Sequence, residues 1–115
     1  METIAVRVLI DESGDAPFEE WYDAISDKTV RQAIASRIRR LREGNFGDHH
    51  SVGGGVSELR IHRGPGYRIY YGRVGSTLVI LLGGGTKRRQ ENDIKEAISL
   101  WEEYRDEIKR RSRDV

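Results

Sequence analysis

The chain has 115 residues and a formal net charge of +1, a length that fits one domain with one modest core. It contains no cysteine, which excludes a disulfide framework, a thiol nucleophile and a zinc site built on thiolates. The first residues carry charges unlike those of a signal or transit peptide, and the longest apolar run, residues 78–82, is far too short to span a membrane. We therefore expect a cytoplasmic protein with no membrane partner.

Charge is distributed unevenly along the chain. Residues 1–27 have a net charge of −7, residues 28–90 a net charge of +10 and residues 91–115 a net charge of −2. A central segment this basic can attract phosphate or an acidic protein, although arginines that simply solvate helix faces would give the same pattern.

The first half of the chain predicts one strand and two helices. Residues 4–10 alternate apolar side chains with others, which is the period of a strand with one buried face. Apolar side chains then recur at helical spacing in residues 18–25 and again in residues 30–41, where Ser26 or Asp27 is placed to cap the second helix. These segments predict a strand followed by a helical hairpin.

The second half predicts three strands and a helix. Residues 45–55 have the composition of a long loop. Strands are predicted at residues 56–62, 67–73 and 77–82, and the last is apolar throughout, as in an interior strand covered on both sides. Apolar residues at helical spacing from 94 to 108 predict the final helix.

The predicted element order is β-α-α-β-β-β-α. It indicates an α+β fold in which a helical hairpin and a C-terminal helix pack on a small, mostly antiparallel four-stranded sheet. No internal repeat or linker divides the chain. We expect a single domain over residues 1–108 and a charged tail that frays over residues 109–115.

Two arginines on neighbouring predicted strands are candidates for binding phosphate. Arg60 and Arg68 project from the sheet face opposite the apolar residues of their strands, and that face is expected to be open. Guanidinium groups there can bind phosphate in a bidentate manner and stack on a base, with Arg63, Tyr70 and Arg73 nearby. The alternative is a structural cross-strand ladder between these arginines and Glu58.

The other candidates are a histidine and a glycine-rich segment. His62 alternates onto the predicted face of Arg60 and could transfer protons near neutral pH, unless it is an ordinary surface histidine. Residues 83–87 (GGGTK) follow a strand but lack the spacing of a P-loop or a dinucleotide fingerprint. The segment is either a plain turn or a place where Lys87, Arg88 and Arg89 hold an RNA phosphate. We expect no cofactor and no metal, because His49 and His50 have no third ligand at suitable spacing.

Taken together, these motifs resemble those of a known family. The residues that carry the resemblance are Glu58-Leu59-Arg60-Ile61-His62, Gly64-Pro65-Gly66-Tyr67-Arg68-Ile69-Tyr70-Tyr71, Leu81-Leu82-Gly83-Gly84-Gly85-Thr86-Lys87, Gln90, Asp93-Ile94, Ala97 and Trp101. They are similar to the addiction-module killer proteins, the phage Gp49-like and HigB-type branch of the RelE/ParE toxin superfamily. The resemblance extends from about residue 18 to residue 104.

This resemblance implies a RelE-like fold and the toxin role in a type II toxin–antitoxin system. The implied partners are a cognate helix-turn-helix antitoxin (HigA-like), which would form a hetero-oligomer with the toxin, and the ribosome with its messenger RNA. RelE-like members are ribosome-dependent endoribonucleases (mRNA interferases), in which the ribose 2′-OH attacks the adjacent phosphate without a metal. Carried over by position, the resemblance implies catalytic roles for Arg60, Arg68 and Lys87. The C-terminal tyrosine of RelE-like enzymes has no clear counterpart in this chain. Proton transfer would therefore fall to His62, Lys87, Tyr70 or the ribosome.

Two other functions remain open at this point. A ParE-like toxin that inhibits DNA gyrase would share the fold and would need a protein-recognition surface, for which the helical hairpin is available. An inactive toxin that only binds its antitoxin would be expected if the arginines form ladder pairs. The sequence alone does not determine the codon preference or the mode of antitoxin binding.

Overall fold

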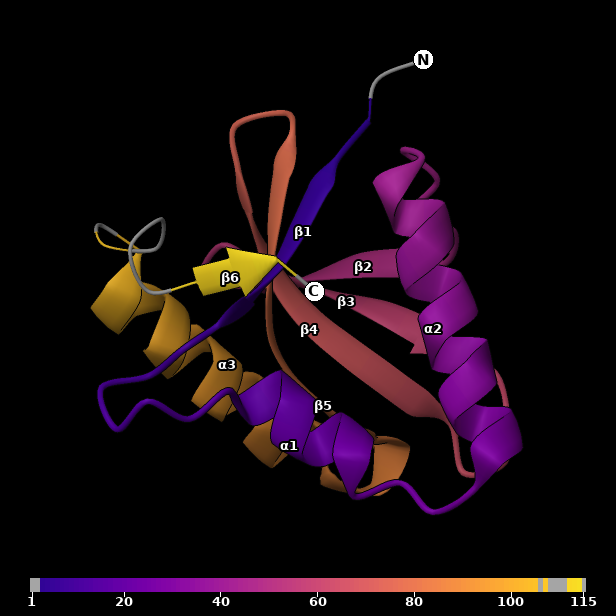
Figure 1. Cartoon of the computed structure of the whole chain (residues 1–115). Coiled ribbons are helices and arrows are strands. Elements are labelled where there is room, and N and C mark those ends of the chain that lie inside the picture. Colours follow the sequence, from indigo (N-terminus) through magenta and orange to yellow (C-terminus); the bar gives the residue numbers. More distant parts are fainter. Residues whose placement is uncertain (1–2, 106, 108–111, 115) are drawn as a thin grey trace.

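The computed structural model describes residues 3–105, 107 and 112–114, and it has an α+β fold (Figure 1). Within these ranges, no helix is long and apolar enough to cross a lipid bilayer. The elements in chain order are β1 (Ala5–Leu9), α1 (Pro17–Asp23), α2 (Lys28–Arg42), β2 (His49–Gly53), β3 (Val56–Ile61), β4 (Tyr67–Val74), β5 (Leu78–Thr86), the 3-10 helix η1 (Lys87–Arg89), α3 (Gln90–Tyr104) and β6 (Ser112–Asp114).

The described strands form one mixed sheet in the order β2-β3-β4-β5-β1-β6. β1 runs parallel to β5, and the other neighbouring pairs are antiparallel. Parallel neighbours need a long connection, which the intervening helices and hairpins supply. The sheet therefore has two strands more than the four that the sequence predicts.

The first of these additional strands is β2, which lies in the segment predicted to be a loop. It pairs with β3 through a turn at residues 53–55, where three consecutive glycines have positive φ. β2 lies at the edge of the sheet, and four of its five residues are exposed. The apolar alternation by which a strand is recognised in a sequence is absent because neither face of β2 is buried.

The second additional strand is β6, which lies beyond the predicted domain boundary at residue 108. Residues 109–115 are expected to fray, but Ser112–Asp114 pair antiparallel with β1. The outer edge of β1 presents backbone N–H and C=O groups, and β6 supplies hydrogen-bonding partners for them. Residues 109–111 and 115 lie outside the described residues.

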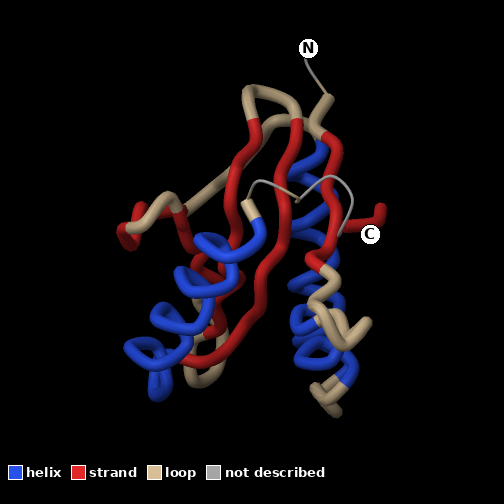
Figure 2. The backbone as a smooth tube through the Cα atoms, turned by 90° about the vertical axis from the view of Figure 1, so that its left-hand side faces the viewer, coloured by secondary structure: helices blue, strands red, loops and turns tan. Residues whose placement is uncertain are grey.

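Helices cover both faces of the sheet, with α1 and α2 on one side and α3 on the other (Figure 2). Residues 78–82 of β5 are all buried and contribute alternately to the two cores, which confirms the prediction of an interior strand. The expectation of an open face behind Arg60 and Arg68 is wrong, because α3 packs Ala97, Trp101 and Tyr104 on that face. A strand that is apolar on both sides requires such a second layer.

The two N-terminal helices begin as predicted but do not pack closely along their length. Asp27 caps α2, since its Oδ1 accepts hydrogen bonds from the backbone N–H groups of Thr29 and Val30 at 2.9 and 3.3 Å. α1 and α2 diverge from the connection between them, so that α1 lies across the end of the sheet and α2 along its side (Figure 1). This divergence leaves a groove between the two helices.

Candidate functional site

The predicted arginine pair is held by one buried carboxylate. Arg60 and Arg68 are direct cross-strand partners on β3 and β4, and Glu58 is cross-strand from Tyr70. Arg60 Nε donates a hydrogen bond to Glu58 Oε2 at 3.3 Å, and Arg68 Nε lies 3.5 Å from the same oxygen. The Glu58 side chain is fully buried. We call Glu58, Arg60 and Arg68 the arginine cluster; its formal charge is one positive unit.

Gln90 completes the surroundings of Glu58. As the first residue of α3, it donates hydrogen bonds from Nε2 to Glu58 Oε1 at 2.7 Å and to Oε2 at 3.1 Å. A buried carboxylate needs paired charges and donors of this kind, because burial of an unpaired charge is costly. The cross-strand ladder considered from the sequence is therefore present as two ion pairs to one carboxylate. Arg60 also hydrogen-bonds to this carboxylate, whereas Arg68 Nε has no hydrogen-bond partner among the described residues.

Lys87 and Arg68 both lie next to Gly66. The backbone N–H of Lys87 donates to the Gly66 carbonyl at 3.0 Å. A side-chain carbon at Gly66 would lie 3.4 Å from Arg68 Nη1 and 3.7 Å from Lys87 Cβ. Arg68 is buried, whereas Arg60 is partly exposed and Lys87 is exposed. The three sequence-predicted cations thus meet at one end of the β3–β4 hairpin.

Tyr70 is buried under α3 rather than exposed for stacking on a base. It is only 1% exposed, and its hydroxyl has no hydrogen-bond partner among the residues that the structure describes. Burial is the main cause that raises the pKa of Tyr70, and the nearby Glu58 and Asp93 carboxylates raise it further. The phenol is therefore protonated throughout the physiological pH range and cannot serve there as a proton acceptor.

His62 does not join Arg60, contrary to the expected alternation. β3 ends at Ile61, and His62 lines a hollow beside α2 together with Arg37, Arg40 and Arg63. His62 Nε2 lies 2.5 Å from Asp48 Oδ2, and His50 Nε2 lies 2.8 Å from Asp48 Oδ1. The hydrogen bond with His62 is the main cause that lowers the pKa of Asp48. The imidazole is thus engaged away from the arginine cluster.

Arg37 is a structurally important residue that the sequence reasoning did not single out. Its Nη1 donates to the Arg60 carbonyl at 2.5 Å, and its Nη2 donates to the Phe46 and Asp48 carbonyls at 3.0 and 3.3 Å. These bonds fasten α2 to β3 and to the segment before β2. Arg37 stands at helical spacing between Ile34 and Leu41 on the apolar stripe of α2, and this position was the signal that could have identified it.

The remaining predicted RNA-binding arginines are dispersed. The Arg73 guanidinium lies 4.7 Å from the centre of the Phe46 ring and donates to the Ser76 carbonyl at 3.1 Å, at the other end of β4 from Arg68. Arg88 and Arg89 follow Lys87 in η1 and line an exposed hollow with Lys95. Among residues 3–105, 107 and 112–114, no three His, Asp or Glu side chains converge as a metal site.

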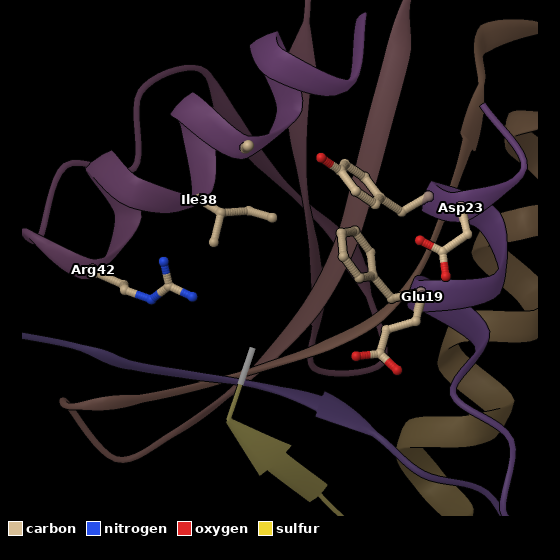
Figure 3. A pocket seen from close by; sticks show the side chains of 7 residues that line it. Glu19, Asp23, Ile38 and Arg42 are labelled. Carbon is tan, nitrogen blue, oxygen red and sulfur yellow. The ribbon is translucent and has the colours of Figure 1, made fainter. Parts of the chain in front are cut away.

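A groove of about 380 Å³ lies between α1 and α2 (Figure 3). Glu19 and Asp23 project from α1 on one side, and Arg42 projects from α2 on the other. Glu19 also accepts a hydrogen bond from Arg113 of β6. The floor between these charged side chains is formed by Phe18, Tyr22, Ala35 and Ile38.

The fold and the arginine cluster define a small α+β protein in which basic side chains gather beside one hairpin. No protein-family model matches the chain. A protein of Haemophilus influenzae, described as an uncharacterized protein, is 45% identical over 86 residues, which cover 75% of this chain and 87% of the relative. This chain belongs to the same family as the Haemophilus influenzae protein.

Proposed function

We propose that the chain is the toxin of a type II toxin–antitoxin system, with a RelE-like fold and ribosome-dependent endoribonuclease activity against messenger RNA. The observation that carries this proposal is that Arg60 and Arg68 share one buried carboxylate and that Lys87 lies beside Arg68 at Gly66. Together with Glu58, these three cations have a formal charge of two positive units. Arg60 is partly exposed and Lys87 is exposed, so that a phosphate can approach them from solvent. Arg88 and Arg89 follow Lys87 in η1 and add two exposed cations next to it in the chain.

The reaction would be transesterification within the RNA backbone. The ribose 2′-oxygen forms a bond to the adjacent phosphorus, the bond from phosphorus to the 5′-oxygen breaks, and the products are a 2′,3′-cyclic phosphate and a 5′-hydroxyl end. The transition state accumulates negative charge on the phosphoryl oxygens, and fixed guanidinium and ammonium donors stabilise that charge. Arg60 and Arg68 are the donors that ion pairs to Glu58 hold in place, and Arg68 Nη1 and Lys87 both lie next to Gly66.

Proton transfer is divided between the 2′-hydroxyl, which must lose a proton, and the 5′-oxygen, which must gain one. Tyr70 is buried with a raised pKa, and His62 is bonded to Asp48 on the α2 side. Lys87 is the one of the three candidates that lies beside Arg68 and is exposed. We therefore assign the protein's share of proton transfer to Lys87 and the remainder to the ribosome.

Inducible expression in a bacterium tests this proposal. We expect the wild type to arrest growth and to generate new in-frame messenger RNA 5′ ends, and we expect Arg68→Lys and Lys87→Ala to abolish both effects. Arg39→Ala is the matched control, because Arg39 is an exposed cation on α2 with no place in the cluster. Intact messages accompanied by an SOS response would refute the nuclease proposal in favour of gyrase inhibition.

Two observations support alternative functions. The Glu58 ladder pairs are what an inactive toxin that only binds its antitoxin would retain, and the apolar groove between α1 and α2 offers a recognition surface for a protein such as gyrase. Both alternatives, like the main proposal, include a HigA-like helix-turn-helix antitoxin in a hetero-oligomer and place the protein in the cytoplasm. A short helix-turn-helix gene adjoining this one is therefore expected, and unrelated genes on both sides would contradict all three.

A further inference from the structure

A small cavity separate from the α1–α2 groove lies where α1, α3 and the β4–β5 pair meet. Its volume is about 190 Å³, and Trp21, Tyr70, Gly84, Asp93 and Glu96 are among the residues that line it. Gly84 makes this arrangement possible, because a side-chain carbon there would overlap the Trp21 ring. Neither the arginine cluster nor Lys87 lines this cavity.

The cavity contains polar groups whose hydrogen-bonding capacity is not used by the described residues. The Tyr70 hydroxyl is buried and has no hydrogen-bond partner in the described part of the chain. Asp93 lies over Gly85, where any side-chain carbon would overlap its carboxylate, and burial raises the pKa of Asp93. An unpaired buried hydroxyl lowers the stability of the ligand-free protein. A ligand that forms a hydrogen bond with this hydroxyl removes that cost, which favours binding.

Of the described residues, two carboxyl groups and no basic side chain line the cavity. These carboxyl groups, Asp93 and Glu96, are one turn apart on α3, and after burial the charge of Glu96 also raises the pKa of Asp93. Arg89, the last residue of η1, acts on Asp93 from outside the cavity lining and lowers its pKa. An occupant with a positive charge would relieve the repulsion between the carboxylates.

We propose that this cavity binds an ammonium or guanidinium group. The N–H donors of such a group can bond to the Asp93 and Glu96 carboxylates and to the Tyr70 oxygen, and the Trp21 ring supplies an aromatic wall for a cation. The proposal does not depend on the nuclease activity, since it uses none of the residues to which that activity is assigned.

Titration with methylguanidinium tests this site, and methylurea is the uncharged control of similar shape. The readout is the indole N–H signal of Trp21 in two-dimensional NMR spectra, assigned with a Trp21→Phe variant. We expect saturable shifts with methylguanidinium and at least about tenfold weaker binding of methylurea. Equal binding of the two probes, or no saturable shift of the Trp21 signal, would overturn the proposal.

Charge-neutralising variants locate the binding groups. Asp93→Asn and Glu96→Gln should each weaken methylguanidinium binding at least about fivefold, whereas Glu102→Gln, on the opposite side of α3, should not change it. Tyr70→Phe removes the unpaired hydroxyl and should weaken binding while leaving the fold at least as stable in thermal unfolding. Unchanged affinity in folded Asp93→Asn and Glu96→Gln proteins would also overturn the proposal.

A third probe distinguishes the two sources of such a group. N-acetylarginine methylamide carries the guanidinium on a peptide-like backbone. If it binds as well as methylguanidinium, the site receives an arginine side chain of a partner protein. If it is excluded while methylguanidinium binds, the site receives a small free cation. Either result supports the proposal that the cavity binds a guanidinium or ammonium group, because methylguanidinium binds in both cases.

Discussion

At the scale of single residues, Glu58 determines how the candidate cations are arranged. One buried carboxylate is shared by Arg60, Arg68 and Gln90. The sequence could place the two arginines on one face by alternation, and it could suggest Glu58 as their ladder partner. It could not show that Gln90, 32 positions away, completes the same group, because that contact depends on how α3 docks on the sheet.

Glu58→Gln tests this arrangement through stability. The substitution preserves shape but leaves two guanidinium groups without their counter-charge, and Arg68 has almost no access to water. We expect the free energy of unfolding, measured by urea denaturation, to fall by about 3 kcal/mol. Glu43→Gln is the control, because Glu43 is exposed at the end of α2, and its effect should stay within about 0.5 kcal/mol. A Glu58→Gln protein as stable as the control would show that the carboxylate does not hold the cluster together.

The raised pKa of Asp93 predicts how the stability of the protein changes with pH. Burial raises its pKa in the folded state, so the stability associated with this group is complete at acidic pH and declines as pH rises through the raised pKa. Asp93→Asn should therefore gain stability relative to the wild type between about pH 4 and about pH 7. The measurement is chemical denaturation of both proteins across that range.

Asp48→Asn is the control of opposite sign. Hydrogen bonds from His62 and His50 lower the pKa of Asp48, so its contribution is present above the ordinary carboxyl range and is lost as pH falls through the lowered pKa. This variant should lose stability relative to the wild type near neutral pH, and the loss should shrink on acidification. Parallel pH profiles for the two variants would contradict the opposite environments described for the two carboxyl groups.

At the scale of elements, the sequence could predict the strands and helices that bury apolar side chains. β1, β3, β4 and the three α-helices carry an apolar period on a buried face, whereas β5 was recognised by its unbroken apolar run, which is buried on both faces. β2 and β6 could not be found in this way, because they are edge strands whose pairing uses backbone groups rather than a buried face. His62 was misplaced for a related reason, since β3 ends one residue before it.

Close approach of helices to the sheet depends on individual glycines in β5. A side chain at Gly84 would overlap the Trp21 ring of α1, whereas a side chain at the adjacent Gly83 would meet no atom within 4 Å. We therefore expect Gly84→Ala to destabilise the protein by about 1–3 kcal/mol and to change Trp21 fluorescence. Gly83→Ala should be close to neutral in both measurements. Similar effects for the two substitutions would contradict the packing of α1 described here.

At the scale of the whole molecule, the sequence could predict the α+β class and most of the element order, but not the number of layers. A long apolar strand indicated that both faces are covered, yet the face of Arg60 was expected to be open. The structure resolves this conflict by spreading α3 over the middle of that face while the arginine cluster remains at its end, where Gln90 begins the helix. The proposed phosphate site is therefore a margin of the sheet and not an exposed plane.

The most direct test of the nuclease proposal uses purified components. Wild-type protein is mixed with ribosomes that hold a defined messenger RNA in the A site, and the fragments are analysed for their ends. We expect a single cut that leaves a 2′,3′-cyclic phosphate and a 5′-hydroxyl without added metal, with a loss of at least about a hundredfold in rate for folded Arg68→Lys and Lys87→Ala and no change for Arg39→Ala. Uncut message with the wild type, or equal cutting by the Arg68→Lys and Lys87→Ala proteins, would contradict the assignment of this activity to the arginine cluster and Lys87.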